Sequence, residues 1–329
     1  MRKTLIKQIF ALALGVFFFA VINIFLYGTI TKRLANNFSG VSQLKMINVE
    51  DYLPFEENNK LPKVQSSLLI EDNQPVLDGA AALVPVYGAI IENTYPKGTV
   101  KYEGGVFSSD NYYGENFASD SKMKYQNTVR GFNALVDGTI DVFFTAYPSK
   151  DQLNSAKEKN VELELVPIGL EAFVFFVNSK NPIENLTSDQ IKDIYACKIT
   201  NWKEVGGIDR SIYPVTRVKN SGSQTMMDKF MGDVEYGKVS PIAITGGAIG
   251  YSFRYYLSGI VDNQNVKMIN LNGISPTKEN IKNNEYPLVA SFYLAYRKDN
   301  TNPNIKPLVD WILSSEGQKL IEEVGYVGL

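Results

Sequence analysis

A run of 22 consecutive uncharged residues, Ile9 to Ile30, separates a short N-terminal end from the rest of this 329-residue chain. As a helix, the run would be about 33 Å long, enough to cross the hydrocarbon core of a bilayer. Three cations precede it and only two follow closely, so the positive-inside bias favours a cytoplasmic N-terminus. We therefore expect a cytoplasmic end at 1–8, a transmembrane anchor at 9–30 and an extracytoplasmic body.

Two other interpretations of the run compete with a permanent anchor. A cleaved signal peptide requires a short apolar region and a small-residue cleavage site, but this run is long and its flank offers no good A-x-A pattern. A buried helix of a soluble domain is the other alternative. A lipid-anchored protein would need a cysteine just after the run, whereas the single cysteine of the chain is Cys197.

The composition excludes several classes of function. Hydrophobic residues make up 44% of the chain, enough for a substantial core, and the net charge of −2 argues against a nucleic-acid partner. The absence of histidine removes Ser-His-Asp and Cys-His catalysis and every histidine-ligated metal site. One cysteine permits neither an internal disulfide nor a cysteine-rich zinc site. We expect a protein that is not an enzyme and that carries no metal or cofactor.

The body shows alternating strand and helix patterns after a polar segment. Residues 31–75 contain three prolines and an acidic patch, which indicates a linker, with ordered structure beginning near Val76. Beyond that point apolar strand patterns such as Ile140–Ala146 and Ala172–Asn178 alternate with amphipathic helices, one of them capped by Thr187 or Ser188. This alternation predicts an α/β fold with a mainly parallel sheet.

The most specific local motif is TRVKNSGSQTMMDKFMG, in which an arginine precedes Ser-Gly-Ser at the start of a helix. Unpaired N–H groups at a helix N-terminus attract anions, and Gly222 lets the backbone approach one closely. The hydroxyls of Ser221 and Ser223 can donate hydrogen bonds, and Arg217 can clamp two oxygens. A purely structural interpretation remains open, because Ser221 and Gln224 also fit the S-x-x-Q capping box.

A second strand-to-helix turn, Asp78-Gly79-Ala80-Ala81-Ala82, offers a weaker anion site. Ala80 and Ala81 can contribute only backbone N–H groups, and a tight turn into a buried helix explains the pattern equally well.

The order of these motifs resembles the phosphate-binding-protein-like family of periplasmic solute receptors, which serve ABC phosphate transporters. The matching pieces are collinear over about residues 75–329, and the run NPIENLTSDQIKDIY…ITNWKEVGG followed by SGSQT is the most specific of them. The resemblance implies a type II periplasmic-binding fold with two α/β lobes and the ligand between them. One lobe would combine 76–168 with 265–329, and the other would comprise 169–264.

The resemblance also implies which residues bind the ligand. It implies phosphate contacts from Arg217, Ser221, Gly222 and Ser223. From the first lobe we expect the backbone N–H groups of Ala80 and Ala81 and a hydroxyl from either Thr145 or Ser149. The chain departs from the family at two places. Relatives have a hydroxyl residue where this chain has Ala81, and phosphate receptors have an aspartate where it reads Phe144-Thr145-Ala146-Tyr147.

Two functions therefore follow as expectations. The first is a membrane-anchored receptor that binds phosphate or a similar oxyanion between its lobes, with an ABC transporter permease as partner. The second is a membrane-tethered sensor or accessory protein that keeps the fold but has lost tight phosphate binding.

Overall fold

The structure, a computed structural model, describes residues 18, 23, 47–105, 115–237 and 247–329. The expected cytoplasmic end (1–8) and, except for Phe18 and Asn23, the expected anchor (9–30) lie outside the described residues. Within the described parts of the chain, no helix has the length and apolar character needed to cross a membrane. Residues Lys45–Leu329 form one compact unit, which we call the body.

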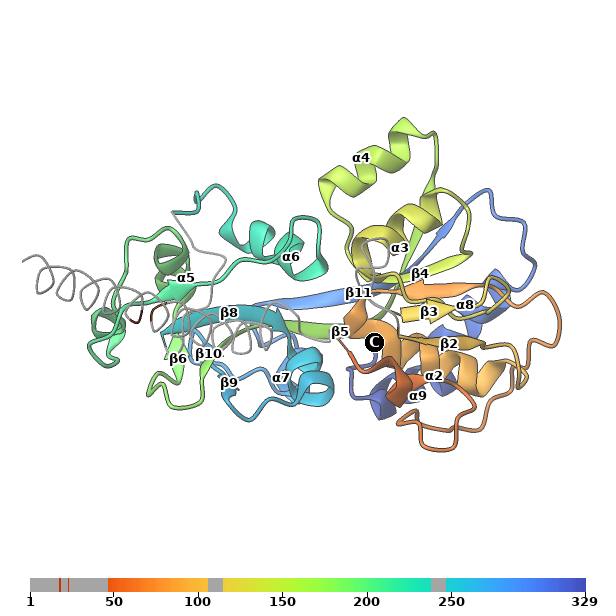
Figure 1. Ribbon diagram of the computed structural model, residues 1–329, viewed down its shortest axis with the longest axis horizontal. Coiled ribbons are helices and arrows are strands. Elements are labelled where there is room, and N and C mark those ends of the chain that lie inside the picture. Colours follow the sequence, from red (N-terminus) through yellow and green to blue (C-terminus); the bar gives the residue numbers. More distant parts are fainter. Residues whose placement is uncertain (1–17, 19–22, 24–46, 106–114, 238–246) are drawn as a thin grey trace, which may run out of the picture. The chain divides into compact units, whose positions relative to one another are not determined.

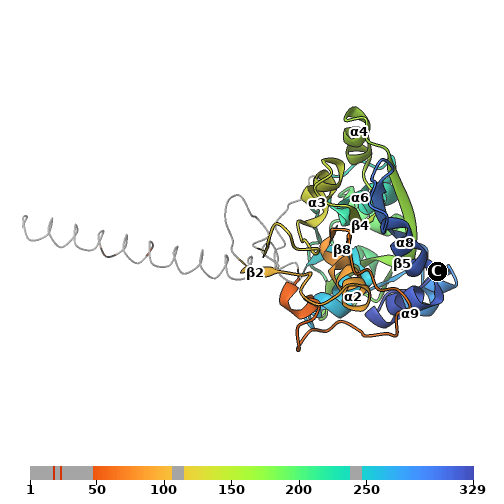
Figure 2. The same cartoon turned by 90° about the vertical axis from the view of Figure 1, so that its right-hand side faces the viewer.

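The body has two α/β lobes, each with its own hydrophobic core (Figure 1). In the first lobe, helix α2 is buried on nearly every side and packs beside α9 (Figure 2). The elements of this lobe are η1 (Val49–Tyr52), β1 (Leu77–Gly79), η2 (Ala81–Leu83), α2 (Val84–Thr94), β2 (Tyr102–Gly105), β3 (Glu115–Phe117), α3 (Asn127–Val136), β4 (Val142–Ala146), α4 (Lys150–Glu158), β11 (Val289–Arg297), α8 (Ile305–Leu313) and α9 (Ser315–Val324).

The second lobe surrounds a core rich in aromatic residues, with Trp202 and Tyr195 fully buried. Its helix α5 begins at a capping box in which Thr187 accepts from the backbone of Gln190, which confirms one of the two predicted caps. The elements of this lobe are β6 (Asn185–Leu186), α5 (Ser188–Tyr195), η3 (Trp202–Val205), β7 (Tyr213–Pro214), α6 (Gly222–Met231), β8 (Ala248–Phe253), β9 (Val266–Met268), β10 (Asn270–Leu271) and α7 (Lys278–Lys282), and the π-helical turn η4 (Tyr256–Val261) follows β8.

A mixed sheet runs through both lobes, so the prediction of a mainly parallel sheet is wrong. Within the described residues its order is β1-β4-β11-β5-β8-β7, with β9 also paired to β5. Only the end pairs, β1 with β4 and β7 with β8, are parallel. The central pairs are antiparallel because β5 and β11 carry the chain between the lobes in opposite directions.

Strand β5 (Leu163–Asn178) is continuous and begins well before the expected strand Ala172–Asn178. Opposite Phe292 and Tyr293 the register shifts by one residue, so Ile168, between Pro167 and Gly169, has no partner in the ladder and forms a bulge, while the pairing continues on either side. Gly169 is required at this point because a Cβ there would lie 2.4 Å from the ring of Phe292. The first half of β5 thus pairs in one lobe and the second half in the other.

Residues 47–75, which we call the strap, belong to the first lobe and not to a linker. The prediction that 31–75 forms a spacer with order beginning near Val76 is therefore wrong for this part. Six strap side chains are buried in the first core: Ile47, Val49, Tyr52, Leu53, Leu61 and Ile70. The apolar residues of the strap are widely spaced and match neither helical nor strand periodicity, so the sequence pattern did not show their burial.

Polar groups of helix α2 fasten the strap to the lobe. The Glu92 carboxylate, whose side chain is 5% exposed, accepts from the backbone of Phe55 and pairs with Lys63 at 2.9 Å. Asn93 donates to the Pro62 carbonyl at 2.9 Å and accepts from the backbone of Val64 at 2.8 Å. These contacts provide hydrogen-bond partners for strap backbone groups that are partly buried.

The lobe boundary near the C-terminus also differs from the expected one. Side chains between positions 265 and 288, including Leu271, Ile281 and Tyr286, pack into the second core, whereas the sequence assigned 265–329 to the first lobe. The chain returns to the first lobe with β11.

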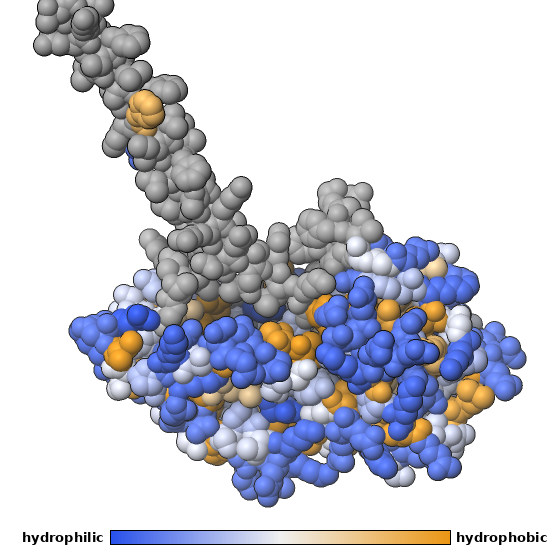
Figure 3. All heavy atoms as spheres, turned by 60° about the horizontal axis from the view of Figure 1, so that its bottom comes forward, coloured by the Kyte–Doolittle hydropathy of each residue, from blue (hydrophilic) through white to orange (hydrophobic). Residues whose placement is uncertain are grey.

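The face of the body in Figure 3 is mainly hydrophilic, with hydrophobic residues in small separate patches.

Candidate functional site

The N-terminus of helix α6 is built by a tight turn. Ser221 donates its backbone N–H to the Val218 carbonyl at 3.1 Å, and Asn220 adopts a left-handed conformation with φ 64°, which asparagine tolerates. The Ser221 hydroxyl accepts from the backbone of Gln224 at 3.3 Å and caps the helix. The structural role considered for this serine is therefore present. Its hydroxyl proton and the backbone N–H groups of Gly222 and Ser223 stay available to an anion.

The capping box itself is incomplete because the Gln224 side chain is used elsewhere. Its amide oxygen accepts from the backbone N–H of Arg217 at 2.8 Å and from the Tyr251 hydroxyl. Its amide nitrogen donates to Asp228 at 2.7 Å. This buried network fixes the backbone of Arg217 relative to α6, so the arginine and the helix N-terminus form one rigid element.

The Arg217 guanidinium lies near two tyrosines. Burial raises the pKa of both hydroxyls, that of Tyr256 to about 12. The positive charge of Arg217 opposes the rise at Tyr251 and at Tyr256. Among the described residues, the arginine ion pairs involve Arg254 and Arg297, not Arg217. The charge of Arg217 is thus not neutralised by a carboxylate within this part of the chain.

The end of strand β4 faces the N-terminus of α6. A Cβ placed on Gly222 would lie 3.5 Å from the Cβ of Ala146, so the two lobes meet at this point. Thr145 is 2% exposed, and its hydroxyl makes no hydrogen bond within the described residues. The structure therefore brings the predicted Ser221–Ser223 segment close to Thr145 through its neighbour Ala146.

The Ala80–Ala81 turn lies at the same edge of the sheet. Strand β1 runs parallel to β4 with Gly79 opposite Phe144, so both strands end there. Ala80 donates its N–H to the Phe144 carbonyl at 2.8 Å, which leaves this group unavailable to a ligand. Ala81 begins η2, where the first N–H groups have no acceptor inside the helix.

A buried carboxylate under this turn was not singled out by the sequence. Asp78 is fully buried and accepts from the backbone of Gly79 at 2.7 Å and from the backbone and side chain of Gln126 at 3.1 and 3.0 Å. Burial raises its pKa to about 7, although these hydrogen bonds and the charge of Lys124 oppose the rise. The sequence signal for Asp78 was the Asp-Gly turn, which does not reveal burial.

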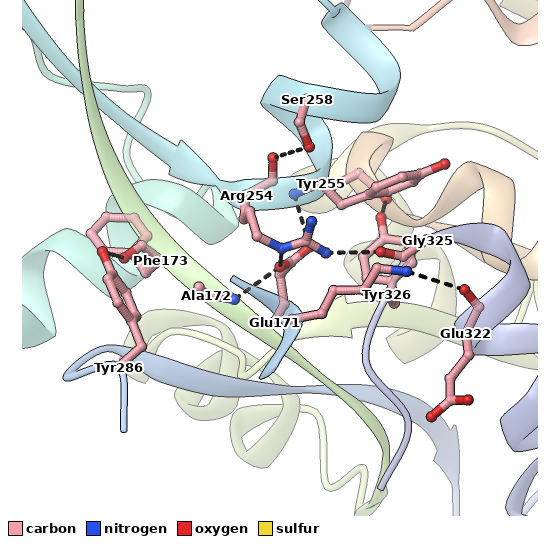
Figure 4. Close-up of polar contacts among 12 residues, drawn as sticks. Glu171, Ala172, Phe173, Arg254, Tyr255, Ser258, Tyr286, Glu322, Gly325 and Tyr326 are labelled. Carbon is pink, nitrogen blue, oxygen red and sulfur yellow. Dashed lines mark hydrogen bonds and ion pairs between the residues drawn. The ribbon is translucent and has the colours of Figure 1, made fainter. Parts of the chain in front are cut away.

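A second arginine of the body, Arg254, lies at the junction of the lobes and not at the α6 N-terminus. Its Nε donates to Glu171 at 3.1 Å, and its guanidinium also donates to the Gly325 carbonyl at 2.8 Å (Figure 4). Burial raises the pKa of Glu171, and the charge of Arg254 opposes that rise. Within the described residues no cluster of three acidic or cysteine side chains suits a metal ion.

A family model described as a PBP superfamily domain matches residues 108–316 of the chain. The chain belongs to the PBP superfamily. This confirms the resemblance inferred from the motifs, and the two-lobed α/β architecture agrees with it. The PBP-like chain contains the strap in addition, because the matched region begins well after it.

Known proteins similar to this PBP-superfamily chain carry names of binding proteins. The phosphate-binding protein PstS of Bacillus subtilis is 24% identical over 67% of this chain and 75% of its own length. The PstS of Staphylococcus epidermidis is 28% identical over 70% of this chain and 79% of its own length. None of these names describes an enzyme, and the expectation of a non-enzymatic protein is confirmed.

Solved structures show the same fold. A substrate-binding protein with bound phosphate from Clostridium perfringens has a TM-score of 0.56 and 24% identity and covers 77% of this chain and 98% of its own. An ABC-type phosphate transport receptor from Vibrio cholerae has a TM-score of 0.54 and 21% identity, and the match covers 77% of this chain and 99% of the receptor chain.

Proposed function

We propose that this protein is a receptor that binds phosphate or a similar tetrahedral oxyanion between its two lobes. The observation that carries the proposal is the rigid N-terminus of α6, with the unpaired Arg217 beside it and Ala146 of the other lobe against it. The names of the relatives support phosphate as the ligand and an ABC transporter permease as the partner.

The chemistry of this site favours an anion with several acceptor oxygens. The α6 N–H groups, the hydroxyls of Ser221 and Ser223, the Arg217 guanidinium and the Thr145 hydroxyl are all hydrogen-bond donors. Two carboxylates beside the site loops are already used, since Asp78 accepts three hydrogen bonds and Asp151 pairs with a lysine. A fully ionised oxyanion, which needs donors only, fits this set.

Isothermal titration calorimetry with phosphate, sulfate and organic phosphates tests the proposal. We expect saturable binding of at least one of these anions by the body, and an affinity loss of more than tenfold in Arg217→Ala. Arg210→Ala is the matched control, because Arg210 is exposed in the same lobe and its side chain makes no hydrogen bond or ion pair within the described residues. No heat with any anion, or equal affinities for both variants, would refute the site.

The alternative function is a membrane-tethered sensor or accessory protein without tight phosphate binding. The two departures from the family, Ala81 and the absence of a carboxylate between Phe144 and Tyr147, favour it. Affinity capture with the full chain separates the two functions. Recovery of transporter permease subunits supports the receptor, and recovery of a sensor kinase without them supports the alternative.

The proposal places the body outside the cytoplasm, with residues 9–30 as a single-pass anchor. The uncharged run and the basic residues before it support this placement. Protease treatment of intact cells should digest the body, whereas carbonate extraction should leave the full chain in the membrane. Release of the body in soluble form would instead indicate a cleaved signal.

A further inference from the structure

We propose that four residues on the two loops beside the anion site form a latch that holds the lobes together. Lys219 pairs with Asp151 at 2.7 Å, and the Ser149 hydroxyl donates to the Asn220 side chain at 3.0 Å. We call Ser149, Asp151, Lys219 and Asn220 the latch. The effect of the latch on ligand release rests on the proposed function. Its effect on the distance between the lobes does not.

The latch lies directly next to both halves of the site. On the first lobe, Ser149 follows Ala146 by three residues and caps helix α4. On the second lobe, Lys219 and Asn220 immediately precede Ser221, the cap of α6. Figure 1 shows α4 and α6 on the same side of the body. Separating the lobes at the latch therefore separates Ala146 from the N-terminus of α6 as well.

Both loops are held in the geometry that the latch needs. Ser149 takes part in a complete capping box with Gln152, which fixes the start of α4. On the other loop, the turn from Val218 to Ser221 fixes Asn220. The hydrogen bond and charge of Lys219 lower the pKa of the Asp151 carboxyl. The latch thus consists of two contacts between the same two loops and not of a single ion pair.

A second ion pair between the lobes provides a matched control. Lys282 of α7 pairs with Glu322 of α9 at 3.1 Å, and these two side chains are 57% and 49% exposed. The side chains of Lys219 and Asp151 are 79% and 52% exposed. Glu322 lies beside the buried Arg254 cluster at the lobe junction (Figure 4). The Lys282–Glu322 pair joins α7 to α9 and involves neither site loop, so reversing its charge tests whether any ion pair between the lobes has the same effect as the latch.

The decisive variant is Asp151→Lys. It adds positive charge near the anion site, so simple electrostatic attraction predicts slower release of an anion. The latch predicts the opposite, because two lysines then repel each other across the lobe contact. Since exposed ion pairs are weak, we expect release of inorganic phosphate to become about two- to fivefold faster. The charge-reversed double variant Asp151→Lys/Lys219→Asp should return towards the wild-type rate.

Distances between the lobes test the latch without any ligand. Spin labels at Lys157→Cys and Lys229→Cys, in a Cys197→Ser background, place one probe on α4 and one on α6. We expect Asp151→Lys, or wild type in 1 M salt, to show a longer and broader distance distribution, and the double variant to restore it. Glu322→Lys should leave the distribution unchanged.

The outcomes separate the two proposals. Unchanged lobe distances in Asp151→Lys, or slower phosphate release from it, would overturn the latch. If no anion binds to the wild type but the distances respond as expected, the proposed ligand is wrong and the latch stands. A response of equal size in Glu322→Lys would show a general electrostatic effect and would also overturn the latch.

Discussion

Arg254 donates from its Nε to a carboxylate oxygen of Glu171 at 3.1 Å, and the two side chains are only 10% and 4% exposed. Glu171 lies on β5 and Arg254 directly after β8, so the pair joins two segments that pass between the lobes. Glu171 also accepts from the backbone of Ala172 and Tyr255, at 2.9 and 3.0 Å. Both carboxylate oxygens of Glu171 are therefore hydrogen-bonded.

Replacing Glu171 with glutamine should strongly destabilise the body. The guanidinium of Arg254 would then be buried without a counter-charge, which costs about 3–5 kcal/mol in comparable buried pairs. Urea unfolding measures the free energy of unfolding. Glu322→Gln, which removes an exposed carboxylate, is the control and should change it by no more than about 0.5 kcal/mol. Equal stabilities for the two variants would contradict the prediction.

Substitutions of Ser221 should separate its capping role from anion binding. Ser221→Ala removes the cap of α6 and should cost about 1 kcal/mol of stability. Ser221→Asp keeps a good cap but places a carboxylate at the helix N-terminus, so we expect near wild-type stability and no phosphate binding. Calorimetry and urea unfolding measure the two effects.

The control for these variants is Ser314→Ala, which removes the cap of α9 away from the site. It should lower stability by a similar amount and leave anion binding intact. Unimpaired phosphate binding by Ser221→Asp would show that this N-terminus is only a structural cap.

Asp78 should make the body less stable as the pH rises. Its pKa is about 7 in the folded protein and ordinarily 3.8, so between these values the folded protein holds a proton that the unfolded chain has released. The free energy of unfolding therefore falls as the pH rises from about 4 to about 7. Above pH 7 the contribution of Asp78 to this free energy no longer changes with pH. The chain has no histidine to titrate in the same range.

The variant Asp78→Asn should lack this contribution. Its amide oxygen can still accept from the backbone of Gly79 and Gln126, and the Gln126 side chain can rotate to accept its amide protons. Between pH 5 and pH 8 we expect wild type to lose about 2 to 3 kcal/mol more than the variant. Glu171, whose pKa is also raised, is common to both proteins and cancels in the comparison. Parallel pH profiles would contradict the assignment.

Truncation should show that the strap is part of the folded domain. A chain that starts at Ile47 should unfold cooperatively with the stability of the full body. A chain that starts at Val76 loses six buried apolar side chains, each worth about 1.5–3 kcal/mol. The total loss, roughly 10 kcal/mol, is comparable to the whole stability of an ordinary domain. Circular dichroism melting and urea unfolding of both chains provide the measurement.

Sequence patterns were sufficient where the deciding interactions are local. The cap at Thr187, the helix start at Ser221 and the buried strand β4 depend on residues a few positions apart, so composition and spacing reveal them. The family could also be inferred, because its motifs occur in the same order. The anion-binding residues remain predictions.

Long-range contacts decided the rest. The strap resembles a linker in sequence because its apolar residues are buried only through packing in the first core, which includes α2. Glu171 and Arg254 are 83 positions apart, and no local pattern distinguishes a buried ion pair from two solvated charges. The meeting of Asp151 with Lys219 likewise depends on how the two lobes pack. Local sequence determines where helices and strands begin, but burial and charge pairing are properties of the surfaces that those elements bring together.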